Sequence, residues 1–123
     1  MRHTLPLFLS ALLVAGCEDG APDPERKKVV AANPVSDQLR TMTPLYRNLG
    51  LRRAIVDSNQ RCKKVDDGAY QEQYKTMAMW VARCSDSGDW QIFIAPNSDV
   101  QVRQCRHAEQ IGLPACKALP PKA

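Results

Sequence analysis

Several residue types and motifs that support catalysis are scarce in this chain. Its 123 residues include only two histidines, and aromatic residues make up 6% of the sequence. No Gly-x-Ser-x-Gly, Gly-x-x-x-x-Gly-Lys or His-Glu-x-x-His pattern occurs, which leaves out the common signatures of serine hydrolases, P-loop enzymes and zinc peptidases. No repeat is visible, so solenoids and propellers are excluded. We therefore expect a protein that is not an enzyme and has no cofactor.

The chain also lacks a strong excess of positive or negative charge. The chain has 17 Lys and Arg residues against 13 Asp and Glu residues, a formal net charge of +4. This is too little to predict a nucleic-acid-binding protein. The apolar share of 44% and the charged share of 24% are ordinary for a globular protein. At this length they predict a single small domain.

No apolar run is long enough to cross a bilayer, which requires about 20 residues. Residues 5–15 are nevertheless apolar at all but two positions, as in the hydrophobic region of a secretory signal. This run ends in Val14-Ala15-Gly16-Cys17. The sequence of an aliphatic residue, two small residues and a cysteine resembles the lipobox of bacterial lipoproteins.

The lipobox resemblance implies that residues 1–16 are a signal peptide and that Cys17 is lipidated, with palmitate-type acyl chains. Such chains anchor a protein firmly, because each buried CH₂ contributes about 0.8 kcal/mol. The expected location is the cell envelope, on the periplasmic side, with inner and outer membrane both open. The alternative is an ordinary signal peptide that is cleaved nearby, in which case Cys17 is a chance thiol.

Residues 17–35 are predicted to form a disordered tether. They contain three prolines and a segregated charge pattern, acidic first and then basic at residues 26–28. Such a stretch buries too little apolar surface to fold. The basic triplet either attracts anionic headgroups or is simply solvated.

One main helix is predicted after a short turn at residues 36–42. Thr43 is the expected N-cap and Pro44 the first helical residue, and the helix should end near residue 59. Apolar residues recur at helical spacing and predict a stripe that packs on the core. The stripe consists of Leu45, Leu49 and Val56, with Leu51 and Ile55 towards its edge.

The second half of the chain predicts an antiparallel meander. Residues 77–84, 90–95 and 100–105 have strand patterns separated by short polar turns, and a fourth, edge strand is possible near residues 61–65. The fold class is therefore α+β: one main helix packed on a three- or four-stranded antiparallel sheet. The expected domain covers residues 36–118, followed by a tail at 119–123.

The predicted register places Cys84 opposite Trp90, and Pro96 opposite Val100. One face of the sheet then carries the core side chains, and Cys84 points to that face whereas Cys105 points to the other. The expected core residues are Trp80, Ala82, Trp90, Ile92, Ile94, Val100 and Val102.

Four cysteines remain after Cys17, and we predict that they form two disulfides. They are separated by 21, 20 and 10 residues, unlike the closely spaced ligand pairs of structural zinc sites. Disulfides are also usual in exported proteins. A pair formed by Cys84 and Cys105 is disfavoured, since strands two apart lie roughly 9–10 Å from each other. Of the remaining pairings, Cys62–Cys84 with Cys105–Cys116 closes the shorter loops.

A short basic segment is the most distinctive candidate for function. Residues 47–64 contain six basic residues and a single acidic one, Asp57. Arginine favours bidentate contacts with carboxylate or phosphate. Arg47, Arg52 and Arg53 are therefore the candidate binding residues, although a solvated helix surface would have the same composition.

The leading hypothesis is a lipid-anchored, non-enzymatic binding or assembly module. Its expected partners are the membrane through the lipid anchor, and an envelope protein or anionic headgroups. The order of elements is distantly similar to that of the small lipoprotein of the β-barrel assembly machinery, which lacks the four cysteines. A periplasmic enzyme inhibitor is the first alternative. A small hydrolase is the second, and it lacks a recognisable nucleophile and base.

Overall fold

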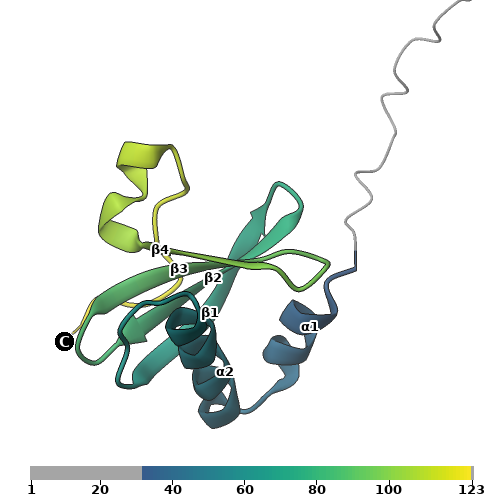
Figure 1. Cartoon of the computed structure of the whole chain (residues 1–123), viewed down its shortest axis with the longest axis horizontal. Helices are drawn as coiled ribbons and strands as arrows, with labels where there is room; N and C mark the ends of the chain where they lie inside the picture. The colour runs from purple at the N-terminus through teal and green to yellow at the C-terminus, as the bar shows by residue number, and fades with distance from the viewer. Residues whose placement is uncertain (1–31, 123) are drawn as a thin grey trace, which may run out of the picture.

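The computed structural model describes residues 32–122 and consists of two α-helices and a four-stranded antiparallel sheet (Figure 1). The strands follow one another in space in the order β1-β2-β3-β4, which is a simple meander. This arrangement confirms the predicted α+β class and its four-stranded form. The elements are α1 (Pro34–Thr41), α2 (Pro44–Asp57), β1 (Val65–Tyr74), β2 (Met77–Cys84), β3 (Gly88–Ile94), β4 (Val100–Gln104) and the 3₁₀ turns η1 (Cys105–His107) and η2 (Glu109–Ile111).

Asn33 already makes defined contacts, three residues before the predicted boundary at residue 36. Asn33 caps α1, because its Oδ1 accepts a hydrogen bond from the Ser36 backbone N–H at 3.2 Å. Its Nδ2 donates to the carbonyl of Ile94 at 2.8 Å, and the residue is buried. The prediction that residues 17–35 form a tether is therefore wrong at its C-terminal end.

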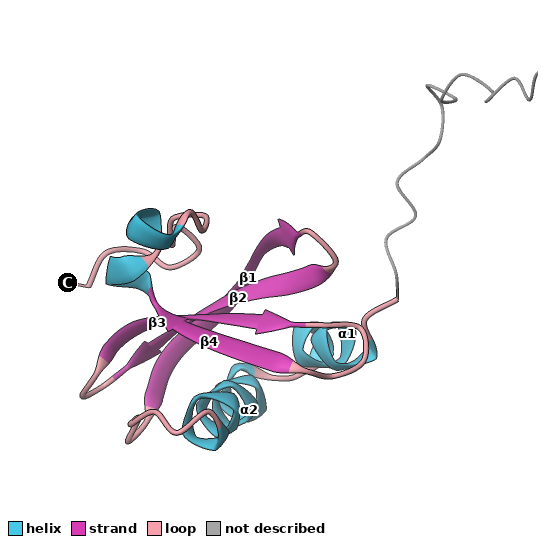
Figure 2. Ribbon diagram, turned by 45° about the horizontal axis from the view of Figure 1, so that its top comes forward, coloured by secondary structure: helices cyan, strands magenta, loops and turns pink. Residues whose placement is uncertain are grey.

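The two helices cover one face of the sheet, where the main core lies (Figure 2). Leu51 and Ile55 of α2 are fully buried there. The Trp80 indole N–H donates to the Ser36 hydroxyl at 2.9 Å, so a buried polar contact fixes α1 on β2. The strand residues on this face are Ala78, Trp80, Ala82, Cys84, Trp90, Ile92, Ile94 and Val102.

The predicted alternation of the strands is confirmed, but the predicted register is shifted by two residues. Trp90 pairs with Ala82 rather than Cys84, and Val100 pairs with Ile94 rather than Pro96. The β2–β3 loop is shorter than predicted, since Gly88 at φ 85° already pairs with Cys84. A shift of two residues keeps each strand residue on its predicted face. Val100, which was predicted in the core, is nevertheless 36% exposed at the start of β4.

The first strand lies later in the sequence than predicted. β1 covers residues 65–74, whereas the sequence predicted a possible edge strand near residues 61–65. Tyr70 and Tyr74 thus belong to a strand. A tight turn follows it, in which Lys75 has a positive φ of 53° and Tyr74 pairs with Met77. Two register irregularities along β1 and its many polar residues explain why its pattern is weak in the sequence.

The C-terminal segment covers the opposite face of the sheet. Met79, Val81 and Phe93 are buried there against Leu113 and Leu119. The predicted tail at residues 119–123 therefore begins inside the packed structure. We call residues 113–120 the C-terminal strap.

Two glutamines of the sheet bind the backbone of the C-terminal strap. Gln71 donates from Nε2 to the Ala115 carbonyl at 2.8 Å and accepts the Lys117 N–H at Oε1, at 2.7 Å. Gln91 is fully buried and donates to the Pro114 carbonyl. Because the strap has no regular secondary structure, these side chains satisfy backbone groups that would otherwise lack partners.

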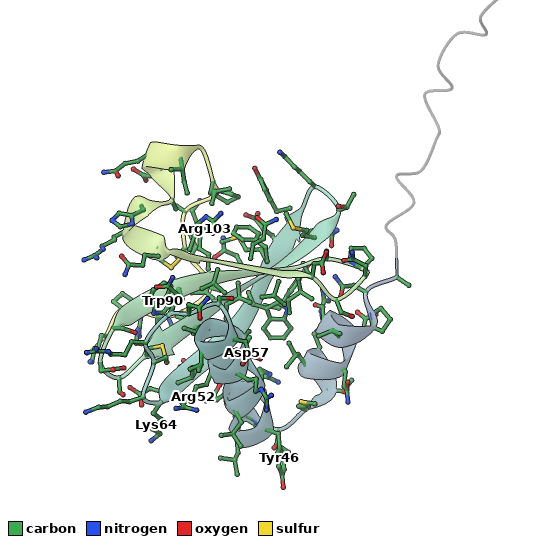
Figure 3. The ribbon with its side chains drawn as sticks, viewed as in Figure 1. Tyr46, Arg52, Asp57, Lys64, Trp90 and Arg103 are labelled. Atoms are coloured by element: carbon green, nitrogen blue, oxygen red, sulfur yellow. A yellow bond between two sulfur atoms is a disulfide. The ribbon has the colours of Figure 1, made fainter. Side chains whose placement is uncertain are left out.

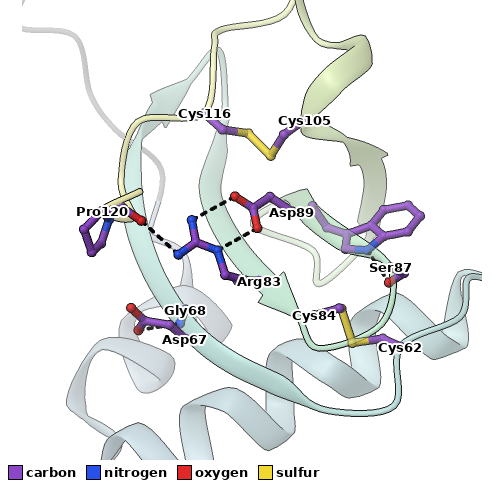
Figure 4. Close-up of polar contacts among 11 residues, drawn as sticks. Cys62, Asp67, Gly68, Arg83, Cys84, Ser87, Asp89, Cys105, Cys116 and Pro120 are labelled. Atoms are coloured by element: carbon purple, nitrogen blue, oxygen red, sulfur yellow. Dashed lines mark hydrogen bonds and ion pairs between the residues drawn. A yellow bond between two sulfur atoms is a disulfide. The ribbon is translucent and has the colours of Figure 1, made fainter. Parts of the chain in front are cut away.

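Both predicted disulfides are present (Figure 4). Cys62 and Cys84 have Cα atoms 5.6 Å apart and join the segment after α2 to the end of β2. Cys105 and Cys116 have Cα atoms 5.7 Å apart and join the end of β4 to the C-terminal strap. Each disulfide therefore belongs to a different face of the sheet.

Candidate interaction surface

Helix α2 is held against the sheet by close backbone approach. A Cβ added at Gly68 in β1 would lie only 2.3 Å from Leu51 Cδ1, so the strand requires glycine there. Asn48 donates from Nδ2 to the Asp66 carbonyl at 3.3 Å. At the other side of the helix, Gly50 lies against Leu39 of α1. These contacts fix which side of α2 faces the core.

The apolar stripe predicted for the core is exposed. Leu45 is 67% exposed, Leu49 55% and Val56 41%, whereas Leu51 and Ile55 are fully buried. The prediction therefore chose the wrong side of the helix. Tyr46, which is 63% exposed, adds a fourth large side chain on α2 and points away from the sheet in Figure 3. We call Leu45, Tyr46, Leu49 and Val56 the exposed patch of α2.

A basic loop borders the exposed patch. Residues 61–64 read Arg-Cys-Lys-Lys, and all three basic residues are exposed. Lys63 and Lys64, together with Leu45 and Leu49, line a depression of about 410 Å³. A second depression, lined by Val56 and Arg61, lies on the other side of Arg52. Apolar and cationic side chains are thus neighbours on one surface.

Arg52 attaches the basic loop to α2. Its Nε donates to the carbonyls of Cys62 at 3.0 Å and Lys63 at 2.8 Å. The Cys62–Cys84 disulfide holds the same loop to β2. Asp86 accepts the Lys63 N–H at 2.9 Å and adds a third attachment. The positions of the loop cations relative to the exposed patch are therefore fixed by the fold.

The three candidate arginines do not form one binding surface. Arg47 donates to the carbonyls of Leu39 at 3.1 Å and Met42 at 3.0 Å, so it binds the C-terminal end of α1. Arg52 binds the basic loop, as described. Arg53 is paired with Asp57 at 3.3 Å. With 100° between successive helical residues, Arg47 and Arg52 lie about 140° apart around α2.

The residues that the sequence missed are those of the exposed patch. The helical spacing of Leu45, Leu49 and Val56 predicted a stripe facing the core, and Tyr46 was not part of that stripe. Leu51 and Ile55 could have indicated the buried side of α2. They share a helix face with Asn48, and Gly50 next to Leu51 leaves room for a close neighbour. Two apolar residues four apart are a short stripe, and Leu45, Leu49 and Val56 made a longer one.

Another depression lies beside the β2–β3 turn and measures about 660 Å³. Arg83 crosses it and binds both oxygens of Asp89, at 2.9 and 3.1 Å, and the Pro120 carbonyl at 2.9 Å (Figure 4). The hydrogen bonds with Asp89 hold the pKa of Arg83 above its ordinary value. The guanidinium is thus a structural link between the sheet and the C-terminal strap.

Among residues 32–122, no group of three or more His, Cys, Asp or Glu side chains is placed to hold a metal ion. His107 lies exposed in η1. Over the same residues, no helix is both long and apolar enough to cross a membrane. Cys17 lies outside the described residues, so its predicted lipidation has no structural counterpart here. No known protein family, curated protein or solved structure matches the chain.

Proposed function

We propose that this protein is a lipid-anchored component of a bacterial cell envelope that acts by contact, as a non-enzymatic binding or assembly module. The exposed patch of α2 is its contact surface. The observation that carries this proposal is the exposure of Leu45, Tyr46 and Leu49, each more than half accessible, on one short helix. Contiguous large apolar side chains at a surface mark interaction sites in soluble domains.

The lipid anchor rests on the sequence Val14-Ala15-Gly16-Cys17 and the apolar run before it. An anchored module needs no strong affinity of its own, because confinement at the membrane raises its effective concentration near other envelope components. A small and shallow contact surface, such as the exposed patch, is then sufficient for function.

The proposal is tested by site-specific photo-crosslinking in intact cells. A photoreactive residue at Leu49 should give discrete adducts, because this side chain is the centre of the contact surface. The matched control is Gln110, which is exposed in the distant turn η2 and should give none. The Cys17→Ser variant should lose both the adducts and the acyl mass of the mature N-terminus.

Two results would contradict the proposal. Identical adduct patterns from positions 49 and 110 would show that the exposed patch has no special role. An unacylated N-terminus in the wild-type membrane fraction would remove the lipid anchor.

A further inference from the structure

We propose that the exposed patch of α2 and the basic loop together bind the surface of an anionic lipid bilayer. This inference deepens the proposed function and rests on it, because it names the occupant of the same contact surface. It is carried by the juxtaposition of apolar and cationic side chains that the fold holds rigidly side by side.

The apolar half of the surface suits the bilayer interface. Leu45, Tyr46 and Leu49 project from the first half of α2 with exposures of 67%, 63% and 55%. Leucine side chains enter the boundary between headgroups and acyl chains, and tyrosine combines an apolar ring with a hydroxyl that stays hydrated. Each of these side chains is more than half exposed, so a flat layer can reach all three.

The cationic half has charges that are free for headgroups. Within residues 32–122, neither Arg61 nor Lys63 lies within ion-pair distance of a carboxylate. Lys64 is 3.9 Å from Asp66, and the lysine side chain is 77% exposed. Two further acids lie nearby: Asp86 accepts the Lys63 backbone N–H, and Asp57 is paired with Arg53. Arg52, Arg61, Lys63 and Lys64 still outnumber the acids Asp66 and Asp86. The local excess of positive charge is therefore complementary to phosphate headgroups.

The length of chain between Cys17 and the folded domain also favours the membrane as the binding partner of this surface. The chain makes sixteen residue-to-residue steps from Cys17 to Asn33, the residue that caps α1. Fully extended, they would span at most roughly 53–58 Å. With Cys17 acylated, the patch would thus stay within reach of the bilayer that holds its own anchor. A bilayer supplies apolar and anionic groups in one layer, whereas a protein partner would need both in a matching arrangement.

The experiment measures binding of the mature chain, residues 17–123 with Cys17→Ser, which lacks both the signal peptide and the acyl anchor, to lipid vesicles by co-sedimentation. Vesicles of phosphatidylcholine mixed equally with phosphatidylglycerol should bind the protein, and pure phosphatidylcholine vesicles should not. Adding Lys63→Glu and Lys64→Glu should weaken binding by about 25-fold or more, at roughly fivefold for each charge lost near the surface. Leu45→Ser with Leu49→Ser should weaken it as well.

The matched control is Lys75→Glu with Lys117→Glu, which changes the net charge equally at two exposed residues, one in the turn between β1 and β2 and one in the C-terminal strap. It should retain the affinity of the parent protein within about twofold, since charges beyond a Debye length of roughly 8–10 Å are screened. Thermal unfolding of each variant establishes that it is folded. The cations at residues 26–28 are present in every variant and contribute equally.

Equal loss of binding in the two charge-reversed variants, or equal binding to neutral vesicles, would overturn the bilayer proposal. Absence of vesicle binding, with adducts from position 49 to a protein retained, would also overturn it and leave the proposed function standing. Absence of both would remove the contact surface altogether.

Discussion

Arg52 and Arg53 are neighbours on α2 with different surroundings. Arg52 donates to two carbonyls of the basic loop, whereas Arg53 meets only Asp57 across one helical turn, with both side chains largely exposed. Hydrogen bonds from a charged donor contribute more than a solvated ion pair. Residue type alone therefore does not reveal which arginine supports the fold.

We expect Arg52→Met to lower the free energy of unfolding by about 1–2 kcal/mol, because two backbone carbonyls lose a charged donor. Arg53→Met, the matched control, should change it by no more than about 0.5 kcal/mol. Denaturant titration with the disulfides intact measures both. Equal effects of the two substitutions would contradict the structural role of Arg52.

The contact between Gly68 and Leu51 predicts a strong coupling between two residues. Gly68→Ala should destabilise the protein by about 1–3 kcal/mol, because the added Cβ would overlap Leu51 Cδ1. In a Leu51→Ala background the same substitution should cost much less, since the overlapping atom is gone. A double-mutant cycle from denaturant titrations measures this difference, and simple additivity would show that the approach is not tight.

At the scale of elements, spacing predicted where secondary structure lies better than which side of it is buried. The start of α2 and the bounds of β2 were predicted correctly from Thr43-Pro44 and from a continuous apolar run. The buried side of α2 was not, because helical spacing identifies residues that share a face without identifying the face that meets the sheet. Contacts at Gly50 and Gly68 decide this, and they depend on the tertiary structure.

In the sheet, the sequence predicted the face on which a side chain lies better than the residue with which it pairs. The apolar pattern correctly predicted the faces of the residues in β2, β3 and β4 and helped to disfavour a Cys84–Cys105 pair. The shorter loops then favoured the two disulfides that are present. The pairing itself was wrong by two residues, because the turn geometry at Gly88 is not readable from the polar run around it. Side chains alternate between faces with a period of two residues, so an error of two residues in the pairing leaves the predicted faces unchanged.

The two disulfides should have different effects when removed. Each contributes about 2–4 kcal/mol by restricting the unfolded chain. Replacing Cys105 and Cys116 by serine should also speed amide exchange locally at Lys117 and Ala118, whose N–H groups bind Gln71. Replacing Cys62 and Cys84 should leave those two amides protected up to global unfolding.

Hydrogen exchange resolved by residue distinguishes the two cases. Identical exchange profiles for the two serine pairs would show that the C-terminal strap is not a separate unit of stability.

At the scale of the whole molecule, the sheet is covered on both faces by different means. Two helices cover one face with a large apolar core, and an irregular strap bound by glutamine side chains covers the other. The sequence predicted the first cover and not the second, because a strap has no periodic pattern. The contact surface escaped prediction for a related reason, since exposed apolar residues have the same spacing as buried ones.

Both disulfides lie after residue 61, and this has a mechanical consequence. A pull applied to the chain at residue 32 meets no covalent cross-link until Cys62. It first breaks the Asn33 contacts and then peels off α1 and α2, about 30 residues that extend to roughly 100 Å. Beyond that point the closed loops shorten the chain available for extension. Under tension, the two helices would therefore unfold and lengthen the chain, whereas the cross-linked sheet would resist extension.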